Sequence, residues 1–385
     1  HKEYYEVIEY EQKVYAKKDE EGNEELVKKA MPTAVIPGSF ATPSLLASII
    51  DKKFTQSLPL YRQEQSLERN GITLSRQTMA NWMIKLHDLY FDVFVEHMHK
   101  QLLKSEYLNV DETTLEVLEL LKTEGRQNCY MWLYKTGRSE DKQMAIYRFE
   151  NDRKHERVKN YLNGYTNVVQ SDGYAAYQNL ESVTNMGCFA HLRRGFVEAI
   201  EAAPKGTDVK NSVTQRLVNL LDELFRLEKV YNKKYKNDYD QILKARLKDS
   251  LPVYNEFYEK VKEIYPYAVK KTHLYESLTY AINNEKYLSY FLEDGRVELS
   301  NNVAERCIKD FVIGRSNFLF SNSVLGAQAS GSAYSIVVSA KLNNLKPYDY
   351  IEYILNQMKG QKLTDELLEA IMPWSTTLPK ELYKK

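Results

Sequence analysis

The spacing of apolar residues changes along the chain from strand-like to helical at about residue 44. Before that point, between residues 4 and 15, Tyr, Val and Ile alternate with Glu and Lys, which predicts a short β-hairpin within residues 1–32. Proline and glycine residues between 32 and 43 mark a linker, after which Ser44 can cap a helix. Residues 33–104 are therefore expected to form a helical region.

Within this region, residues 58–86 have the pattern of a helix-turn-helix. One helix is predicted over Tyr61–Arg69 and a second after Ser75, with a sharp turn at Gly71 between them. Three polar residues are expected on the exposed face of the second helix, where they can reach DNA phosphates or base edges: Arg76, Gln77 and Asn81. A plain helical hairpin in a bundle fits the same pattern.

From Tyr107 the apolar residues take strand-like spacing. Three consecutive antiparallel strands are predicted at residues 107–117, 130–134 and 144–149, then a helix at 154–162, and further strands at 167–170 and 186–190. Three strands, helix, strand, helix, strand is the order of a ribonuclease-H-like core. We therefore predict an α/β fold with a mixed five-stranded sheet, formed by residues 105–195 and 298–346.

Residues 196–297 keep helical spacing and lose strand character, which predicts an all-helical insertion in this core. Residues 226–271 contain twelve Lys or Arg and seven Asp or Glu, an excess of five positive charges. Such an excess suits DNA binding and is equally common on a solvated helix face. We expect the insertion to cover the DNA side of the core, and residues 347–385 to form a helical tail.

Composition adds limits on the class of protein. The chain has 385 residues, 43% of them hydrophobic and 28% charged, which suits a globular protein of two or three domains. No membrane-spanning run and no leader sequence are evident, so we expect an intracellular protein. The chain begins at His1, so we expect a processed chain or a fragment without its upstream part.

Charge and cysteine content limit how the chain could bind nucleic acid and which cellular compartment suits it. Lys plus Arg and Asp plus Glu number 53 each, so any nucleic-acid binding must depend on local basic patches. The three cysteines are widely spaced, which excludes a disulfide framework and fits a reducing compartment.

Three acidic residues are candidate catalytic groups. Asp111 lies inside a predicted strand, Asp172 at the end of the fourth strand, and Glu305 in the first turns of a late helix. A carboxylate in a sheet is tolerated when it is paired or binds a cation, and neighbouring strands would bring Asp111 and Asp172 together. The same positions also fit a strand with a polar face, a turn aspartate and a surface glutamate at a helix N-terminus.

A further group of residues surrounds Cys188. Cys188 and His191 alone make an incomplete metal site, so we expect Cys188 to be buried on the fifth strand and His191 to lie near the catalytic pocket or a DNA phosphate. Arg193 and Arg194 are expected to bind the DNA backbone, although a solvated helix start fits them too. Arg306, next to Glu305, can pair with a carboxylate or a phosphate.

Several segments together resemble the transposases of the insertion sequence 66 family. They are Leu58–Gln63, Leu74–Thr78, Val110–Thr113, Ser171–Tyr174, Cys188–Arg194, Leu299–Arg306, Ile313–Phe318 and Ala340–Asn343. The resemblance extends from about residue 33 to Trp374. Residues 1–32 lack the cysteine zinc motif that the family usually carries upstream of its core.

The resemblance implies a DDE transposase that cleaves DNA strands and transfers them at the ends of a mobile element. Asp111, Asp172 and Glu305 would hold two Mg²⁺ or Mn²⁺ ions, with Asp111 bridging them, and Arg315 would join the DNA-binding residues. The implied partners are double-stranded DNA, further copies of the chain and companion proteins of the element, in the bacterial cytoplasm at the nucleoid. A catalytically silent DNA-binding descendant and a ribonuclease-H-like nuclease remain as alternatives.

Overall fold

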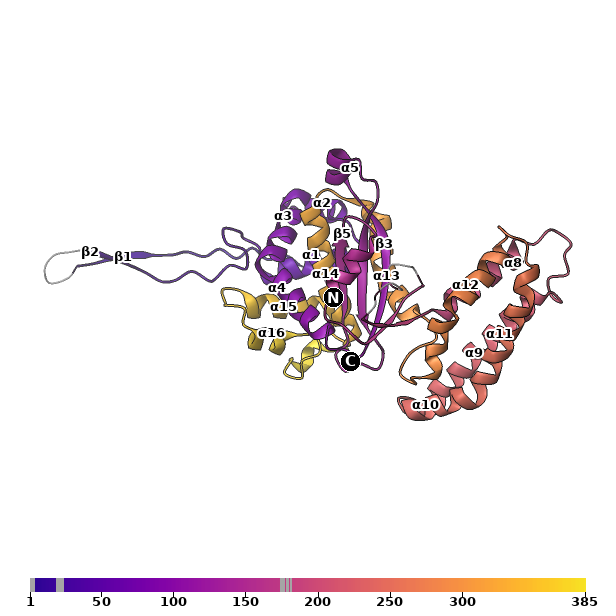
Figure 1. Cartoon of the computed structure of the whole chain (residues 1–385). Coiled ribbons are helices and arrows are strands. Elements are labelled where there is room, and N and C mark those ends of the chain that lie inside the picture. The colour runs from indigo at the N-terminus through magenta and orange to yellow at the C-terminus, as the bar shows by residue number, and fades with distance from the viewer. Residues whose placement is uncertain (1–3, 19–23, 174–176, 178–179, 181) are drawn as a thin grey trace.

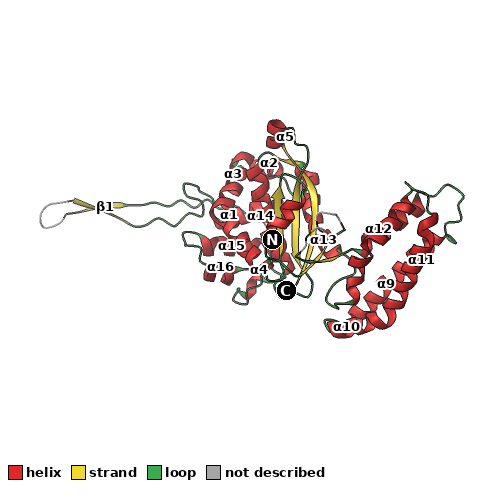
Figure 2. Ribbon diagram, viewed as in Figure 1, coloured by secondary structure: helices red, strands yellow, loops and turns green. Residues whose placement is uncertain are grey.

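The computed structural model describes residues 4–18, 24–173, 177, 180 and 182–385. A mixed α/β body lies at the centre, with a β-hairpin extending from one side and a bundle of helices on the other (Figure 1). Strands occur in the hairpin and in the body, whereas the bundle is helical (Figure 2). The α/β class predicted from the sequence is confirmed.

The predicted hairpin consists of β1 (Val14–Lys18) and β2 (Glu24–Lys28), which pair antiparallel. Every residue of both strands is exposed to solvent. The hairpin stands clear of the body in Figure 1, so it takes no part in the main core.

The helical region after the linker begins with α1 (Pro43–Phe54). Its cap is Thr42, whose hydroxyl accepts from the N–H of Leu45, so the prediction that Ser44 caps this helix was wrong. Pro43 at the first helical position explains the shift, because a proline is favoured where no N–H is needed.

The two helices predicted within residues 58–86 are present as α2 (Leu60–Arg69) and α3 (Arg76–Leu86). Gly71, between them, has a φ of +79°, which a glycine adopts without strain. Ser75 caps α3 as predicted, by accepting from the N–H of Thr78. A π-helical turn (His87–Phe91) then continues into α4 (Asp92–Leu102).

These N-terminal helices pack around a helix from the far end of the chain, α14 (Val324–Leu342). Twelve residues of α14 are buried, and α1, α3 and α4 all contact it. The last helices, α15 (Pro347–Met358) and α16 (Asp365–Ile371), contact α1 and α4 respectively. One hydrophobic core therefore joins the N-terminal helices, the sheet and the C-terminal helices. The division into domains that we predicted from the sequence stays a prediction.

The sheet has the strand order β5-β4-β3-β6-β7. Its members are β3 (Tyr107–Val117), β4 (Cys129–Thr136), β5 (Ala145–Glu150), β6 (Val168–Gln170) and β7 (Thr184–Met186). The first three pair antiparallel, as predicted, and β6 and β7 run parallel to β3. A sixth strand, β8 (Phe320–Ser321), pairs with the far end of β3, so the predicted count of five was too low.

Two differences from the sequence prediction lie near the sheet. A helix, α5 (Leu118–Glu124), follows β3 where we expected only turn residues. The strand predicted at 186–190 is instead the end of β7 followed by α8 (Phe189–Glu201), with Cys188 as the residue before the helix. Phe189, Leu192 and Phe196 are buried at helical spacing, which explains why this segment is a helix.

The helix α6 (His155–Tyr161) agrees with the prediction at 154–162. The helix that we expected between β6 and β7, and Tyr174 of the second acidic motif, lie outside the residues that the structure describes.

The open edge of the sheet is covered by α14. The N–H groups of Ala145 and Tyr147, on β5, donate to the hydroxyls of Ser339 and Ser335 at 3.0 and 2.8 Å. Gly331 lies one turn earlier, and a Cβ there would meet the carbonyl oxygen of Tyr147 at 2.7 Å. Small residues at intervals of four thus let α14 approach β5 closely, and two of them accept hydrogen bonds from N–H groups at the edge of the sheet.

The insertion is helical throughout its described residues, as predicted. After α8 it contains α9 (Val213–Tyr235), α10 (Tyr239–Ala245), a π-helical turn (Arg246–Ser250), α11 (Leu251–Ile264) and α12 (His273–Leu288). A second hydrophobic cluster joins α8, α9, α11 and α12 to the ends of β3, β6 and β7, at Tyr107, Val168 and Met186.

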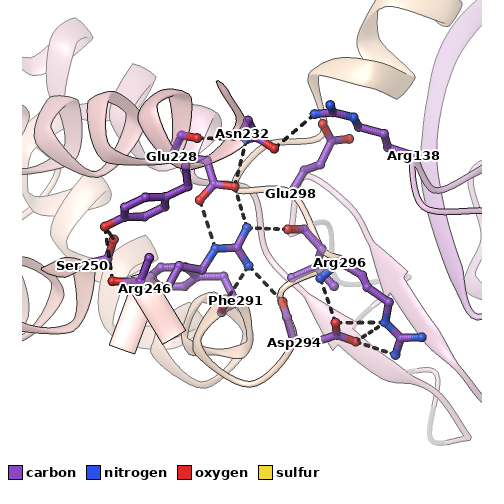
Figure 3. A network of polar contacts seen from close by, with 12 residues as sticks. Arg138, Glu228, Asn232, Arg246, Ser250, Phe291, Asp294, Arg296 and Glu298 are labelled. Carbon is purple, nitrogen blue, oxygen red and sulfur yellow. Dashed lines mark hydrogen bonds and ion pairs between the residues drawn. The ribbon is translucent and has the colours of Figure 1, made fainter. Parts of the chain in front are cut away.

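A buried arginine connects the insertion to the segment that returns to the sheet (Figure 3). Arg246 is fully buried and donates to both carboxylate oxygens of Glu228, on α9, at 3.0 and 2.6 Å. Its remaining N–H groups donate to the carbonyl oxygens of Phe291, Asp294 and Val297. Because a buried charge needs such partners, this network fixes the path on which the chain re-enters the core.

No helix among the described residues is both long enough and apolar enough to cross a lipid bilayer.

Candidate active site

Asp111 lies on the face of β3 that α13 (Asn302–Phe318) covers. Successive strand residues point to opposite faces, so Asn109, Asp111 and Thr113 share one face. Asn109 donates to the side chain of Asn301, the residue before α13, at 2.9 Å. Thr113 accepts from Arg315, on α13, at 3.0 Å. These two contacts place Asp111 beneath the first half of α13.

Glu112 belongs to the opposite face and has partners of its own. Its carboxylate forms an ion pair with Arg153 and accepts a hydrogen bond from the hydroxyl of Tyr177. The side chain is only 2% exposed. Of the two adjacent acidic residues on β3, Glu112 is therefore the one that is already paired within the fold.

Asp172 follows β6 and lies at the same edge of the sheet as Asp111. In the parallel register Gln170 is opposite Asn109, and each aspartate is two residues further along its strand. The backbone carbonyl of Asp172 accepts a hydrogen bond from the hydroxyl of Tyr280, on α12, at 2.8 Å. Gly173 has a φ of +89°, and a Cβ there would lie 2.8 Å from the same hydroxyl. The turn after β6 is therefore packed closely against the insertion.

Glu305 is in the first turn of α13, as predicted from the sequence. Its N–H donates to the backbone carbonyl of Asn301 at 3.0 Å, and the helix N-terminus favours a negative charge there. Its Oε1 atom is buried and has no hydrogen-bond partner in the described part of the chain.

The charges of Asp172 and Glu305 both act on Asp111. Burial, followed by the charges of Glu112 and Asp172, raises the pKa of Asp111 from 3.8 to about 8. The charge of Glu305 acts in the same direction. Negative groups from β3, the turn after β6 and α13 thus all disfavour a charged Asp111, and a cation would relieve this repulsion.

Two basic residues of α8 face this group. His191 Nδ1 lies 3.8 Å from Glu305 Oε1, and Arg194 Nη2 lies 3.6 Å from the same oxygen. Arg194 also contacts His191 Nε2 at 3.3 Å. Burial lowers the pKa of His191, while the charges of Asp172 and Glu305 oppose that effect. The structure therefore brings His191 and Arg194 together with Glu305, and places His191 within the influence of the Asp172 charge.

The cysteine beside them is not on a strand, contrary to our prediction. Cys188 is buried at the start of α8, and its Sγ accepts from the N–H of Asn301 at 3.2 Å. Burial raises the pKa of its thiol to about 11, so it is held as a neutral thiol. No disulfide forms among the three cysteines, all of which are buried.

The other predicted DNA-binding residues are spread over the molecule. Arg193 forms an ion pair with Asp222, on α9, at 2.5 Å, and so connects α8 to the insertion. Arg315 is turned towards β3, where it donates to Thr113 and Thr114. Arg306 is exposed on α13, near Glu298.

The polar residues of α3 lie on its exposed face, as predicted. Arg76 packs over the ring of Tyr61 at 5.3 Å, and Gln77 donates to Asn81 at 3.0 Å. Their side chains are thus ordered on the surface, at a site separate from the acidic group.

The acidic group has the chemistry of a divalent-cation site. Carboxylate oxygens are the ligands that Mg²⁺ and Mn²⁺ prefer, and the buried Oε1 atom of Glu305 has no protein donor among the described residues. In the described part of the chain no three Asp, Glu, His or Cys side chains are arranged so that they could hold one ion. Mg²⁺ keeps several waters and needs only one or two protein carboxylates, so binding of an ion here would not require all three carboxylates at once.

Two residues close to the acidic group were not predicted as part of a site. Asn301 was not singled out from the sequence, although it lies in the Leu299–Arg306 motif. Tyr280 carries no sequence signal, because its contact with Asp172 spans 108 residues and depends on how the insertion packs.

Comparisons with known proteins identify the relatives of this chain. Residues 38–329 match the family described as Transposase IS66 family. The chain is 29% identical to the uncharacterized protein y4qI of Sinorhizobium fredii (strain NBRC 101917 / NGR234), over 92% of this chain and 66% of that protein. It is 27% identical to y4hP of the same strain, over 89% of this chain and 64% of that protein. The chain thus spans about two thirds of the length of these relatives.

Among solved structures, the chain is similar to the Drosophila P element transposase in its strand transfer complex. The TM-score is 0.40 and the identity 13%, over 77% of this chain and 92% of that chain.

Proposed function

Because the chain belongs to the IS66 family of transposases, we propose that it cleaves DNA strands at the ends of a mobile element and joins them to target DNA. The observation that supports this most strongly is the acidic group around Asp111. Burial, and then the charges of Glu112, Asp172 and Glu305, raise the pKa of Asp111 to about 8. Such crowding of negative charge is costly in a fold unless the site binds a cation.

The topology of the sheet supports a ribonuclease-H-like core. Three antiparallel strands are followed by two strands parallel to the first, in the order β5-β4-β3-β6-β7. In this arrangement Asp111 is on the central strand, Asp172 follows its parallel neighbour, and Glu305 comes from a helix that crosses the same face.

In the proposed site, Asp111, Asp172 and Glu305 would hold two Mg²⁺ or Mn²⁺ ions. When bound, such ions activate a water or hydroxyl nucleophile and stabilise charge on the phosphate that is attacked. Arg194, which is half exposed beside Glu305, is positioned to bind a phosphate of the DNA strand. His191 lies close enough to Glu305 to orient its carboxylate.

Recognition of the element ends is assigned to α3. Arg76, Gln77 and Asn81 are exposed on one face of a helix that is anchored on α14 by its opposite face. Replacement of Arg76 and Gln77 by Ala should weaken binding to end sequences by about 1–3 kcal/mol for each hydrogen-bonded base that is no longer read. Binding to random DNA should weaken less. We further propose assembly of several copies on DNA, with companion proteins of the element, at the bacterial nucleoid.

The function is tested with a matched pair of variants, Asp111→Asn and Glu112→Gln. A supercoiled plasmid that carries the gene with its flanking DNA is incubated with each protein and Mg²⁺. We expect Asp111→Asn to bind the plasmid and leave it uncut, because a cation ligand has been removed. Glu112→Gln should retain cleavage in proportion to its folded fraction. Equal cleavage by Asp111→Asn and the unaltered chain would rule out this site.

A further inference from the structure

Beneath the three carboxylates lies a layer of three buried amide side chains, Asn109, Gln170 and Asn301. Each is at most 1% exposed. Asn109 is two residues before Asp111 and Gln170 is two before Asp172, while Asn301 is four before Glu305. Every segment that carries a proposed metal ligand therefore also contributes one amide, and we call this set the amide layer.

The three amides are hydrogen-bonded to one another. Asn109 Nδ2 donates to Gln170 Oε1 and to Asn301 Oδ1, both at 2.9 Å. The hydroxyl of Tyr107 also donates to Gln170 Oε1. Asn109 Oδ1 has no hydrogen-bond partner among the described residues, but the bonds that the amides do share resist breaking, because each broken bond would leave a further unsatisfied group away from water. The spacing of the three segments is thus fixed from within the protein.

Asn301 is the member of the amide layer that is hydrogen-bonded to the most segments of the proposed site. Its Nδ2 donates to the backbone carbonyl of Val110 at 2.8 Å, in the peptide that joins Val110 to Asp111. The backbone carbonyl of Asn301 accepts from the backbone N–H of Glu305 at 3.0 Å. The backbone N–H of Asn301 donates to Cys188 Sγ, at the start of α8. One residue therefore connects the segments that carry Asp111, Glu305 and His191.

We propose that the amide layer, with Asn301 at its centre, is a positioning device that sets the spacing of the three carboxylates for cation binding. This inference rests on the proposed function. The role requires an amide at position 301, because the side chain must donate to one backbone carbonyl and accept from another amide at once. An aspartate of the same shape would turn an oxygen towards the Val110 carbonyl, and the repulsion would shift β3 relative to α13.

The test compares Asn301→Asp with Asn302→Asp. Both changes add the same charge at the start of α13, but Asn302 is exposed and lies outside the amide layer. Plasmid cleavage is measured as a function of Mg²⁺ concentration, and thermal unfolding gives the folded fraction. For Asn301→Asp we expect cleavage to fall about 10–100-fold and the Mg²⁺ requirement to rise about tenfold, as for changes to groups that orient metal ligands. Asn302→Asp should behave like the unaltered chain.

A milder variant keeps the proposal testable if Asn301→Asp does not fold. Tyr107→Phe removes one hydroxyl that donates to Gln170 and should raise the Mg²⁺ requirement a few-fold with cleavage retained at high Mg²⁺. An unchanged Mg²⁺ requirement in the folded variants would overturn the positioning role. Asp111→Asn is measured alongside: if it is inactive while Asn301→Asp is normal, only this inference fails, and if it is active, the proposed function fails.

Discussion

The hydroxyl of Tyr280 donates a 2.8 Å hydrogen bond to the backbone carbonyl of Asp172. Tyr280 belongs to α12 of the insertion, and Asp172 belongs to the turn after β6. The insertion therefore contacts the proposed active site directly and supports the backbone of one of its carboxylates. This contact gives the helical bundle a role in the chemistry besides any contact with DNA.

Removal of this hydroxyl in Tyr280→Phe should lower plasmid cleavage several-fold. The ring would still fill its place, but the Asp172 carbonyl would lose its donor and the turn would be held less firmly, at a cost of about 1 kcal/mol. Tyr287→Phe is the matched control, since the Tyr287 hydroxyl makes no hydrogen bond within the described residues. Single-turnover cleavage rates at saturating Mg²⁺ provide the measurement, and equal rates for the two variants would contradict the prediction.

Asp111→Asn should make the metal-free protein more stable at pH 8. Burial and the nearby carboxylates of Glu112 and Asp172 raise the pKa of Asp111 to about 8 in the folded state. An acid with a raised pKa costs stability once the pH exceeds its ordinary value of 3.8, and this cost grows until about pH 8. Asparagine avoids it, so the gain should be on the order of a few kcal/mol at pH 8 and smaller at pH 5.

Thermal unfolding in EDTA at the two pH values tests this prediction. Added Mg²⁺ should raise the unfolding temperature of the unaltered chain, because a ligand that binds only the folded state stabilises it. The same addition should have a much smaller effect on Asp111→Asn. A variant that is less stable than the unaltered chain at pH 8 in EDTA would show that the carboxylate is not under electrostatic strain.

Many elements of the fold could be predicted from the sequence, because each has a strong local signal. The alternation of β3, the turn at Gly71 and the helical spacing of the insertion are all properties of neighbouring residues. Asp111 and Asp172 could be placed together because the predicted strand order makes their two strands neighbours in the sheet. The segment after Cys188 was misread because a short apolar run fits a strand and a buried helix start equally well.

Other features could not be predicted, because they depend on residues far apart in the chain. The separation of Asp111 from Glu112 required knowing that Arg153 and Tyr177 lie on the second face of the sheet. The strand β8 has only two residues, and it forms by pairing with the last residues of β3, which extends beyond its pairing with β6. Asn301 has a distinct role only through contacts with Asn109 and Val110, nearly two hundred residues earlier.

Ser335→Ala should destabilise the fold by about 1–3 kcal/mol, because it leaves the buried N–H of Tyr147 without an acceptor. Ser330→Ala is the matched control on the same helix. Its hydroxyl is half-buried and donates only to the carbonyl of Gly326, one turn earlier. Chemical unfolding of the two variants gives the difference in free energy. A loss no greater than that of Ser330→Ala would indicate that water reaches the edge of β5.

Glu369→Gln should lower stability by about 1 kcal/mol at pH 7, after allowance for a side chain that is 42% exposed. Burial favours the neutral acid, but hydrogen bonds from Lys142 and His97 outweigh it and lower the pKa of Glu369 to about 2. A lowered acid pKa stabilises the fold above the ordinary value of 4.5, and the benefit is lost as the pH falls towards 2.

The effect of Glu369→Gln should therefore shrink between pH 4.5 and pH 2. Thermal unfolding at pH 7 and pH 3 measures it. Glu352→Gln, on α15, is the control, because that carboxylate has no ion pair or hydrogen bond among the residues described. An effect of Glu369→Gln that is the same at both pH values would mean that the contacts of α16 with α4 do not depend on this charge.

Neutralisation of Lys233, Lys234 and Lys236 should flatten the salt dependence of DNA binding. These lysines are at the end of α9, where Asn232 accepts a hydrogen bond from Arg138 in the loop between β4 and β5, so they lie at the end of the bundle nearest the core. Each lysine that contacts a phosphate releases about one counterion, so the slope of log affinity against log salt should fall by at most about 3. Lys270 and Lys271, in the loop between α11 and α12, are the control, because that loop is at the opposite end of the bundle.

Filter-binding titrations over a range of salt concentrations give the slope for each set of lysines. If the slope is unchanged for the first set, this end of the bundle does not lie on DNA, and its contribution to the active site is limited to the support of Asp172 by Tyr280.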